Sequence, residues 1–379
     1  MQIKGTLKSF INSEKSGGLV LIVCTLLSLL LANSRIGQEY LAIWGFEIGG
    51  HHLEHWINDG LMAIFFLLVG LELVQEVYEG HLASLRIAML PISAAIGGML
   101  VPALIYAVFN AGTPTQSGFG IPMATDIAFA LGILSLLGKR VPLSLKVFLT
   151  ALAVIDDLGA IIVIAIFYST GIAWANLLIS LGLFALLMVL NKVFKVQNLI
   201  PYILGGVVMW YFMLHSGVHA TIAGVLLAIT IPFKRKDPNC PSMRVQKWLH
   251  YPVAFFVLPV FALANTAITI EGGWDQAIGE PFALGIIFGL VIGKPIGITL
   301  FSFLSVKLKL CRLPDKLKWK ELLGAGMLGG IGFTMSIFIT LLAFDDALHI
   351  NESKLMIMLS SLVAAIIGFG WLNAVLKKD

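Results

Sequence analysis

The sequence contains few charged residues. Only 12% of its 379 residues are Asp, Glu, Lys or Arg, whereas 58% are hydrophobic. A soluble domain carries roughly 25% charged residues, so this composition excludes an ordinary soluble protein. Apolar runs of about 18 residues or more, long enough for a helix that crosses a bilayer, recur along the whole chain. The composition therefore predicts an all-α polytopic membrane protein.

Cysteines, barrel-like alternation and nucleotide-binding motifs are also scarce or absent. The three cysteines, Cys24, Cys240 and Cys311, are too few for a disulfide framework and lack metal-ligand spacing. Ten-residue segments that alternate polar and apolar residues, typical of a membrane β-barrel, do not occur. No Gly-x-x-x-x-Gly-Lys-Ser/Thr motif is present, so neither an ATP-driven mechanism nor a cofactor is expected. The net charge of +4 lies in loops that orient the helices, and no nucleic-acid partner is expected.

The apolar runs predict twelve membrane-spanning helices. The first run follows three lysines, as in a signal peptide, but it is long and lacks a good cleavage site, so it is expected to remain as a helix. The short link 215–218 separates the seventh span from the eighth. The predicted spans cover residues 10–33, 54–78, 87–109, 119–138, 143–168, 173–192, 199–214, 217–231, 245–268, 282–304, 321–343 and 352–375.

The distribution of basic residues supports this count. Of the 25 Lys and Arg residues, 22 fall on the side of the amino terminus, which leaves Arg35 and Lys354 in opposite loops and Lys294 inside a span. Cytoplasmic loops of membrane proteins carry such an excess of basic residues. Both termini are therefore predicted to be cytoplasmic.

The segment 44–52 lies between the first two spans. Apolar residues alternate with polar or small ones from Trp44 to Ile48, which suits a strand of a small hairpin. A plain loop with a tryptophan at the membrane interface fits the same residues. The nearby histidines lack the spacing of a metal site, and no role is assigned to them.

Two adjacent aspartates, Asp156 and Asp157, fall near the centre of the predicted span 143–168. A charged side chain at that depth costs about 2.5–3.5 kcal/mol on insertion scales, and such residues are commonly functional. Neighbours on a helix point about 100° apart, so the two carboxylates are expected to face different partners. Carboxylate oxygens bind hard cations, and a carboxyl group removed from water can also hold a proton near neutral pH. The pair is therefore a candidate site for cations and protons.

Lys294 is the basic residue expected inside a span. A lone ammonium at mid-span needs an anion or the negative ends of half-helices. A buried structural ion pair is the alternative role for the two aspartates. However, one lysine cannot neutralise two anions, which favours the functional interpretation.

Two spans contain residues that interrupt a helix. Pro122 lies in the fourth span, and a glycine run that includes Gly330 and Gly332 lies in the eleventh. Interrupted backbone in a membrane is tolerated only where it lines protein or a water-filled cavity. The two spans hold matching places in the triplets 87–168 and 282–375, which have opposite orientations. This pattern indicates an inverted-repeat transporter with its binding site at the two breaks.

Polar residues accompany both breaks. Thr125 and Asp126 follow Pro122, and Thr334 follows the glycine run. Asp126 can neutralise the positive amino ends of half-helices, or it can serve with Thr125 as a ligand on the ion path. Thr334 is the expected counterpart of Asp126 across the crossing.

Six stretches of the chain together resemble a known family. They are residues 56–72, 122–130, 155–160, 216–221, 293–297 and 330–338. They resemble the NhaA Na+/H+ antiporters of bacterial inner membranes, a family that is itself a standard example of inverted repeats with broken helices. The resemblance covers nearly the whole chain in order.

The resemblance implies that the chain exports Na+, or Li+, in exchange for H+. It implies that Asp157 is the main Na+ ligand, that Asp156 and Asp157 both carry protons, and that Asp156 pairs with Lys294. Lys294 is then either structural or a proton participant whose ion pair breaks and reforms. Competition between ions and protons for the aspartates gives obligatory exchange, and two protons per Na+ make it electrogenic.

Further titratable residues lie near the ends of spans. Glu72 and Glu76 share one helical face, either as a solvated helix end or, as the resemblance implies, in a cytoplasmic funnel with pH control. Asp59 lies in an outer funnel or in the wet interface. His219 and His250 are candidate pH sensors because histidine titrates near neutrality, although a lone histidine is more often simply hydrogen-bonded.

Two other functions compete with antiport as interpretations of the sequence. A symporter of a small solute would need a larger polar pocket than the small, anionic mid-span set. An intramembrane aspartyl protease needs two aspartates that share a proton. Asp126 and Asp157 could meet in that way, but the motif Gly-x-Gly-Asp is missing and Lys294 would disrupt the dyad.

The expected organisation is a single transporter domain over residues 1–379, and no enzymatic activity is expected. Segments 40–78 and 199–268 are expected to form an interface that includes the hairpin. The expected partners are Na+, Li+, H+ and membrane lipid. The resemblance also implies a homodimer through the hairpin.

Overall fold

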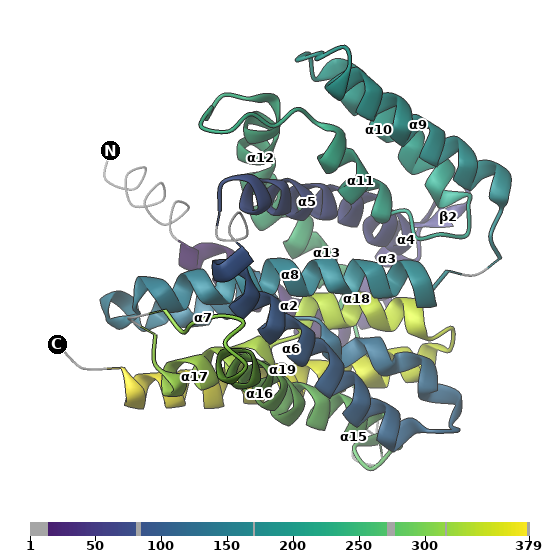
Figure 1. Cartoon of the computed structure of the whole chain (residues 1–379). Helices are drawn as coiled ribbons and strands as arrows, with labels where there is room; N and C mark the ends of the chain where they lie inside the picture. The colour runs from purple at the N-terminus through teal and green to yellow at the C-terminus, as the bar shows by residue number, and fades with distance from the viewer. Residues whose placement is uncertain (1–13, 81–84, 170, 271–276, 315–316, 377–379) are drawn as a thin grey trace, which may run out of the picture. The chain divides into compact units, whose positions relative to one another are not determined.

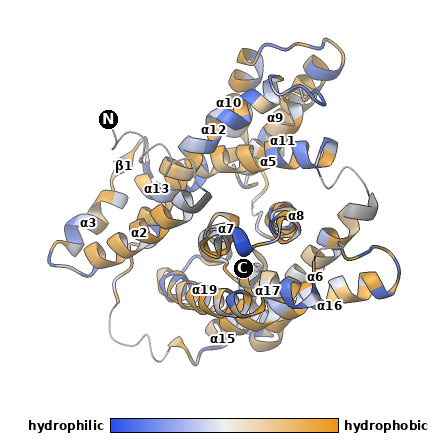
Figure 2. Cartoon of the chain, turned by 90° about the vertical axis from the view of Figure 1, so that its left-hand side faces the viewer, coloured by the Kyte–Doolittle hydropathy of each residue, from blue (hydrophilic) through white to orange (hydrophobic). Residues whose placement is uncertain are grey.

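The computed structural model describes residues 14–80, 85–169, 171–270, 277–314 and 317–376. The described chain is mostly helical, with one two-stranded sheet. Among the described residues, seven helices are long and apolar enough to cross a membrane, and up to ten spans result when each pair of helices bent at a short break is counted as one span. Most of the helical ribbon has the colour of hydrophobic residues (Figure 2). The predicted polytopic helical architecture is therefore confirmed, whereas the count of twelve spans stays a prediction.

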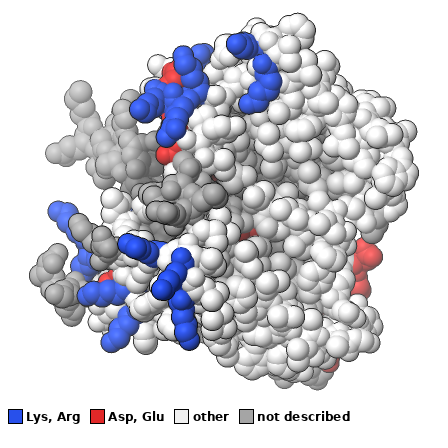
Figure 3. Space-filling model, viewed as in Figure 1, with Lys and Arg blue, Asp and Glu red and all other residues white. Residues whose placement is uncertain are grey.

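Most of the face in Figure 3 carries no charged side chain, and the Lys and Arg side chains on it gather in a few groups. Such a surface suits helices embedded in lipid, because a charged side chain in the hydrocarbon region is costly.

The chain forms two compact units. The first contains the described parts of residues 1–33, 84–160 and 268–379, and the second contains those of residues 34–83 and 161–267. The helices of the first unit are α2 (Glu14–Ala32), α6 (Leu85–Asn110), η3 (Pro114–Met123), α7 (Ile127–Leu136), η4 (Gly138–Arg140), α8 (Leu143–Phe167), α15 (Pro281–Phe288), η6 (Gly289–Gly293), α16 (Lys294–Lys307), α17 (Trp319–Gly329), α18 (Phe333–Ala343) and α19 (Ala347–Val375). Helix α8 continues from the first unit into the second after residue 160.

Small residues allow close packing in the first unit. Helices α6 and α16 run side by side (Figure 1). Their backbones meet at Gly97 and Gly297, where a Cβ on either residue would collide with the carbonyl oxygen of the other. This approach fixes the start of α16 against α6, and α16 begins with Lys294.

Two helix pairs of the first unit are bent at short breaks. The helix axis bends by 44° between η3 and α7, across residues 124–126. It bends by 46° between α17 and α18, across residues 330–332. The backbone N–H of Asp126 donates to the carbonyl oxygen of Ile331 at 2.6 Å. The two breaks therefore lie against each other and satisfy part of each other's hydrogen-bonding capacity.

The first half of the fourth predicted span differs from the expected α-helix. Helix η3 is a 3-10 helix, and it begins at Pro114 rather than at residue 119. Tyr106 and Asn110 of α6 hold its first turn, because the hydroxyl of Tyr106 donates to the carbonyl of Thr115 at 2.8 Å and Asn110 Oδ1 accepts from the Thr115 hydroxyl at 2.8 Å. Pro122 lacks an N–H and so cannot donate to an α-helical ladder.

The second unit contains a small sheet and two helical segments that each include a π-turn. Its elements are α3 (Gly37–Trp44), β1 (Glu47–Ile48), β2 (His51–His52), α4 (Leu53–Trp56), η1 (Ile57–Leu61), α5 (Met62–Tyr78), α9 (Trp174–Lys192), α10 (Ile200–Leu214), α11 (Ile222–Thr230), α12 (Pro241–Pro252), η5 (Val253–Val257) and α13 (Leu258–Asn265). Helix α11 packs against α5, where a Cβ on Gly70 would lie 2.7 Å from that of Ala228. Both η1 and η5 are π-turns.

The segment 44–52 forms the hairpin, one of its two predicted alternatives. Glu47 pairs with His52 and Ile48 with His51 in an antiparallel register. Gly49 and Gly50 connect the strands with φ angles of 61° and 87°, which a two-residue hairpin turn favours.

Two elements of the second unit depart from the predicted spans. Helix α3 lies between the first two predicted spans, where no helix was predicted. Helix α11 has nine residues. At 1.5 Å per residue it is about 14 Å long, roughly half of the bilayer's hydrocarbon thickness. The eighth predicted span, 217–231, is therefore not a full-length helix.

Candidate functional site

Helix α8 carries both central aspartates into the interior of the first unit. The side chains of Asp156 and Asp157 are 1% and 2% exposed. Oδ2 of Asp156 lies 2.5 Å from Nζ of Lys294, which is itself fully buried. A charge-assisted hydrogen bond of this length is among the stronger interactions in proteins. Asp157 follows Asp156 on the same helix and is buried with it.

Lys294 also reaches the first helix break. Its Nζ donates to the hydroxyl oxygen of Thr125 at 2.8 Å, and that hydroxyl donates to the carbonyl oxygen of Gly329 at 2.8 Å. Lys294 thus connects α16 to α8 and to both broken helices. Oδ1 of Asp156 has no hydrogen-bond partner among the described residues, so it is available to a proton or a cation.

Asp126 joins the amino ends of two half-helices. Its Oδ1 accepts from the backbone N–H of Phe129 at 3.0 Å and caps α7. Its Oδ2 accepts from the backbone N–H of Thr334 at 3.1 Å and from the Thr334 hydroxyl at 2.6 Å. A carboxylate at the positive ends of α7 and α18 is favourable for both helices. This geometry agrees with the neutralising role considered for Asp126.

The backbone at the breaks is tied down by further contacts. The carbonyl oxygen of Ile121, next to Pro122, accepts from the Ser336 hydroxyl at 2.7 Å. Gly330 is the C-cap residue of α17, and Gly332 is the N-cap residue of α18. A Cβ on Gly330 would collide with the carbonyl oxygen of Leu290, so a larger residue does not fit there.

Asp59 of the second unit lies between two histidines. Its Oδ2 is 3.2 Å from Nδ1 of His55, and its Oδ1 is 3.4 Å from Nδ1 of His219. Its backbone carbonyl, within the π-turn η1, accepts from the Trp210 indole at 3.1 Å. The residue is therefore fixed by α4, α10 and the segment before α11.

The carboxylates near the end of α5 lie on one helical face. Glu72 and Glu76 are half-buried, and Glu79 is exposed and accepts a hydrogen bond from the backbone N–H of Lys236. Electrostatic repulsion acts between Glu72 and Glu76. His250 is exposed, and its ring packs edge-on against Tyr251.

Comparison with known proteins identifies the family. The family model described as Na+/H+ antiporter 1 matches residues 8–372. The chain belongs to the Na+/H+ antiporter 1 family. The predicted resemblance to NhaA proteins is thereby confirmed.

Relatives of this antiporter match it over almost their whole length. A Na+/H+ antiporter NhaA of Flavobacterium psychrophilum is 61% identical, with 100% of this chain and 98% of the relative covered. Proteins of the same name from Cytophaga hutchinsonii and Dechloromonas aromatica are 60% and 58% identical, and the match covers 100% of this chain and 97% and 98% of theirs. The fold resembles that of the sodium proton antiporter MjNhaP1 from Methanocaldococcus jannaschii, with a TM-score of 0.52, 14% identity and 99% of both chains covered.

The first unit of the antiporter brings six of the predicted residues together. They are Thr125, Asp126, Asp156, Asp157, Lys294 and Thr334. The predicted candidates Asp59, Glu72, Glu76, His219 and His250 belong to the second unit. Sequence reasoning gave no role to His55, although its i,i+4 spacing to Asp59 on one helix could have indicated the contact.

Proposed function

We propose that this antiporter exchanges Na+ for H+ at the buried carboxylates of its first unit. Asp157 is the main Na+ ligand, and Asp156 alternates between a proton and Lys294. The observation that carries the proposal is the ion pair of 2.5 Å between Asp156 and Lys294, buried next to Asp157. Li+, which is also small and hard, is expected to replace Na+.

The charges of the site explain why the two fluxes are coupled. Two adjacent carboxylates in a region of low dielectric constant cannot both stay ionised without cations. When Na+ is bound, it compensates Asp157 and Lys294 compensates Asp156. When Na+ leaves, Asp157 takes one proton, and Asp156 takes a second one when it parts from Lys294. Because the two ions compete for the same carboxylates, binding of one requires release of the other. If both aspartates carry protons, two H+ enter for each Na+ exported and the exchange is electrogenic.

The two breaks give this site access to both sides of the membrane. We assign the fold to twelve spans, with the interrupted fourth and eleventh spans crossing at mid-membrane and inverted triplets around them. The boundaries of the two compact units support this division, because the first unit contains most of residues 87–168 and 282–375. The segments 40–78 and 199–267 fall in the second unit.

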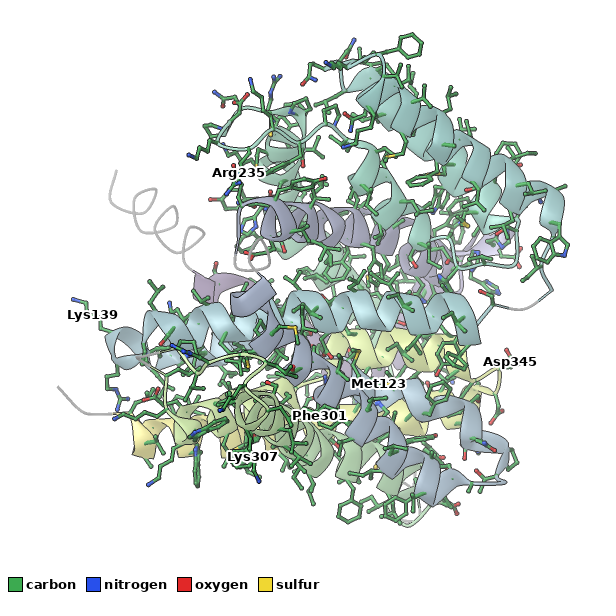
Figure 4. The ribbon with its side chains drawn as sticks, viewed as in Figure 1. Met123, Lys139, Arg235, Phe301, Lys307 and Asp345 are labelled. Carbon is green, nitrogen blue, oxygen red and sulfur yellow. The ribbon has the colours of Figure 1, made fainter. Side chains whose placement is uncertain are left out.

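The orientation follows from the loop charges. Lys139 lies at one end of the first unit and Asp345 at the opposite end (Figure 4). Basic loops are typically cytoplasmic. We therefore place both termini in the cytoplasm and the protein in a bacterial inner membrane. The hairpin 47–52 is the candidate contact of a homodimer.

The titratable residues of the second unit are the candidates for regulation by pH. Glu72 and Glu76 repel each other at the end of α5 that we assign to the cytoplasmic funnel. Asp59 and His219 form a contact at the other end of the same helical segment. A charge change in either group alters the local attraction for cations. His250 is the remaining candidate sensor.

Flux measurements with an isosteric variant test the proposal. Purified protein is reconstituted into proteoliposomes that contain a pH-sensitive dye, and Na+ is added on one side. The wild-type protein should move protons in response, and Asp157→Asn should reduce this flux to the level of empty vesicles. Asp345→Asn, a change at an exposed residue, is the control and should behave as wild type. Sustained Na+/H+ exchange by Asp157→Asn would refute the ligand assignment.

A further inference from the structure

The helix that carries Lys294 contains a π-turn directly before this residue. The π-turn η6 separates α15 from α16. Single π-turns inside α-helices, with their i→i+5 hydrogen bonds, are rare and often occur at functional sites. A π-turn holds one residue more than an α-helical turn, so the residues after it are rotated by about 100° relative to a regular helix. The direction of the Lys294 side chain therefore depends on η6.

The π-turn packs against the last turn of η3, next to the first break. A Cβ on Gly289 would lie 2.6 Å from Cβ of Pro122, a distance that real Cβ atoms do not tolerate. A Cβ on Gly293 would lie 3.0 Å from Cα of Pro102 in α6. The two glycines at the ends of η6 thus allow its backbone to approach η3 and α6.

The π-turn also packs against the second break. The carbonyl oxygen of Leu290 occupies the space that a Cβ on Gly330 would need. The Leu290 side chain approaches Gly332, where a Cβ would lie 3.0 Å from Cδ2 of Leu290. The backbone of η6 is consequently in contact with both interrupted helices, within one compact unit.

The end of the Lys294 side chain reaches the same region as the π-turn before it. Its Nζ reaches the Thr125 hydroxyl at the first break and the Asp156 carboxylate on α8. Thr125 in turn donates to Gly329 at the second break. The backbone before Lys294 and the end of its side chain are thus held by the same two breaks.

We propose that η6 is a positioning element and that Gly289 is a positioning residue for the reaction: the π-turn seats the Lys294 ammonium against Asp156 and Thr125. The proposal rests on the function assigned above to Asp156 and Lys294. A displacement of Pro122 or Gly330 is transmitted through η6 to the Lys294 ammonium. When the ammonium withdraws, Asp156 takes a proton, and when it returns, Asp156 releases the proton.

A double-mutant cycle in proteoliposomes tests this role. Gly289→Ala and Lys294→Ala are made singly and together, and the pH profile of Na+-driven proton flux is measured for each. Gly289→Ala should shift the profile in the same direction as Lys294→Ala and should add no further shift in the Lys294→Ala protein. Gly370→Ala is the matched control, because a Cβ there meets no atom within 4 Å, and its profile should equal that of the wild type.

Two results would overturn the positioning role. One is a Gly289→Ala profile identical to that of the wild type. The other is a shift of equal size with and without Lys294, which indicates a structural effect unrelated to the lysine. If Gly289→Ala does not fold, Gly293→Ala, with a less severe contact, takes its place in the cycle under the same criteria. Wild-type exchange and its loss in Asp157→Asn, measured in parallel, show whether a failure concerns η6 alone or the transport site itself.

Discussion

Nζ of Lys294 lies 2.5 Å from Oδ2 of Asp156, and the two side chains are 0% and 1% exposed to solvent. The two residues are 138 positions apart and come from α16 and α8. Their charges compensate each other in a region where neither is easily accommodated alone. The pair therefore stabilises the contact between α16 and α8, and it is also a candidate carrier of protons.

Removal of Lys294 should destabilise the protein because it leaves Asp156 buried without its counter-charge. Breaking a buried ion pair on one side commonly costs about 3–5 kcal/mol. Lys294→Ala should lower the thermal unfolding temperature in detergent, measured by intrinsic fluorescence. The double variant with Asp156→Asn should recover much of the loss because it contains no unpaired charge. Lys192→Ala, a change at an exposed residue, is the control and should unfold at the wild-type temperature. An unchanged unfolding temperature of Lys294→Ala would contradict the account.

The hydroxyl of Thr334 should stabilise the crossing of the broken helices. It donates to Asp126 at 2.6 Å, and a hydrogen bond to a charged group contributes about 1.5–3 kcal/mol. Thr334→Val removes this bond and keeps the side-chain shape. The matched control is Thr340→Val in the same helix, where the hydroxyl donates to the neutral carbonyl of Ser336 at 2.9 Å. Thr334→Val should lower the unfolding temperature more than Thr340→Val, and equal losses would argue against a charged Asp126.

Asp346 should stabilise the start of α19 in a pH-dependent manner. Hydrogen bonds from the side chain and backbone of His349 hold the pKa of Asp346 below its usual value of 3.8. A carboxyl group with a lowered pKa stabilises the fold above its usual pKa, and this contribution disappears as the pH falls through the lowered value. Asp346→Ala should therefore unfold at a lower temperature than wild type at neutral pH.

The difference in unfolding temperature between Asp346→Ala and the wild type should disappear in acid, because Asp346 is then protonated. Asp345→Ala serves as the control because the neighbouring Asp345 does not cap the helix. A difference that persists unchanged in strongly acid solution would show that the carboxylate charge has no part in the cap.

The prediction of two interrupted spans rests on a local chemical signature. Pro122 removes a backbone donor, and the glycines around Gly330 weaken a helix, so each position favours a break without any knowledge of distant contacts. The partnership of Lys294 with Asp156 was expected only through the resemblance to NhaA proteins. Nothing in the spacing of two residues so far apart indicates a contact.

The π-turns and the 3-10 helix could not be read from the sequence. The apolar run around η6 looks like any other membrane-spanning segment, since one extra residue in a turn leaves composition unchanged. Gly289 of the π-turn packs closely against Pro122. Because these residues are far apart in the sequence, their contact becomes apparent only in the folded structure. The same holds for the short helix α11, whose apolar sequence continues beyond the helix itself.

Proton release on addition of Na+ tests the central claim most directly. Purified protein in weakly buffered detergent solution receives Na+ at a series of pH values, and a pH indicator records the protons released. The account predicts release by the wild type over the pH range in which the aspartates are protonated, and none by Asp157→Asn. Absence of release by the wild type at every pH would contradict competition between Na+ and H+ for one site.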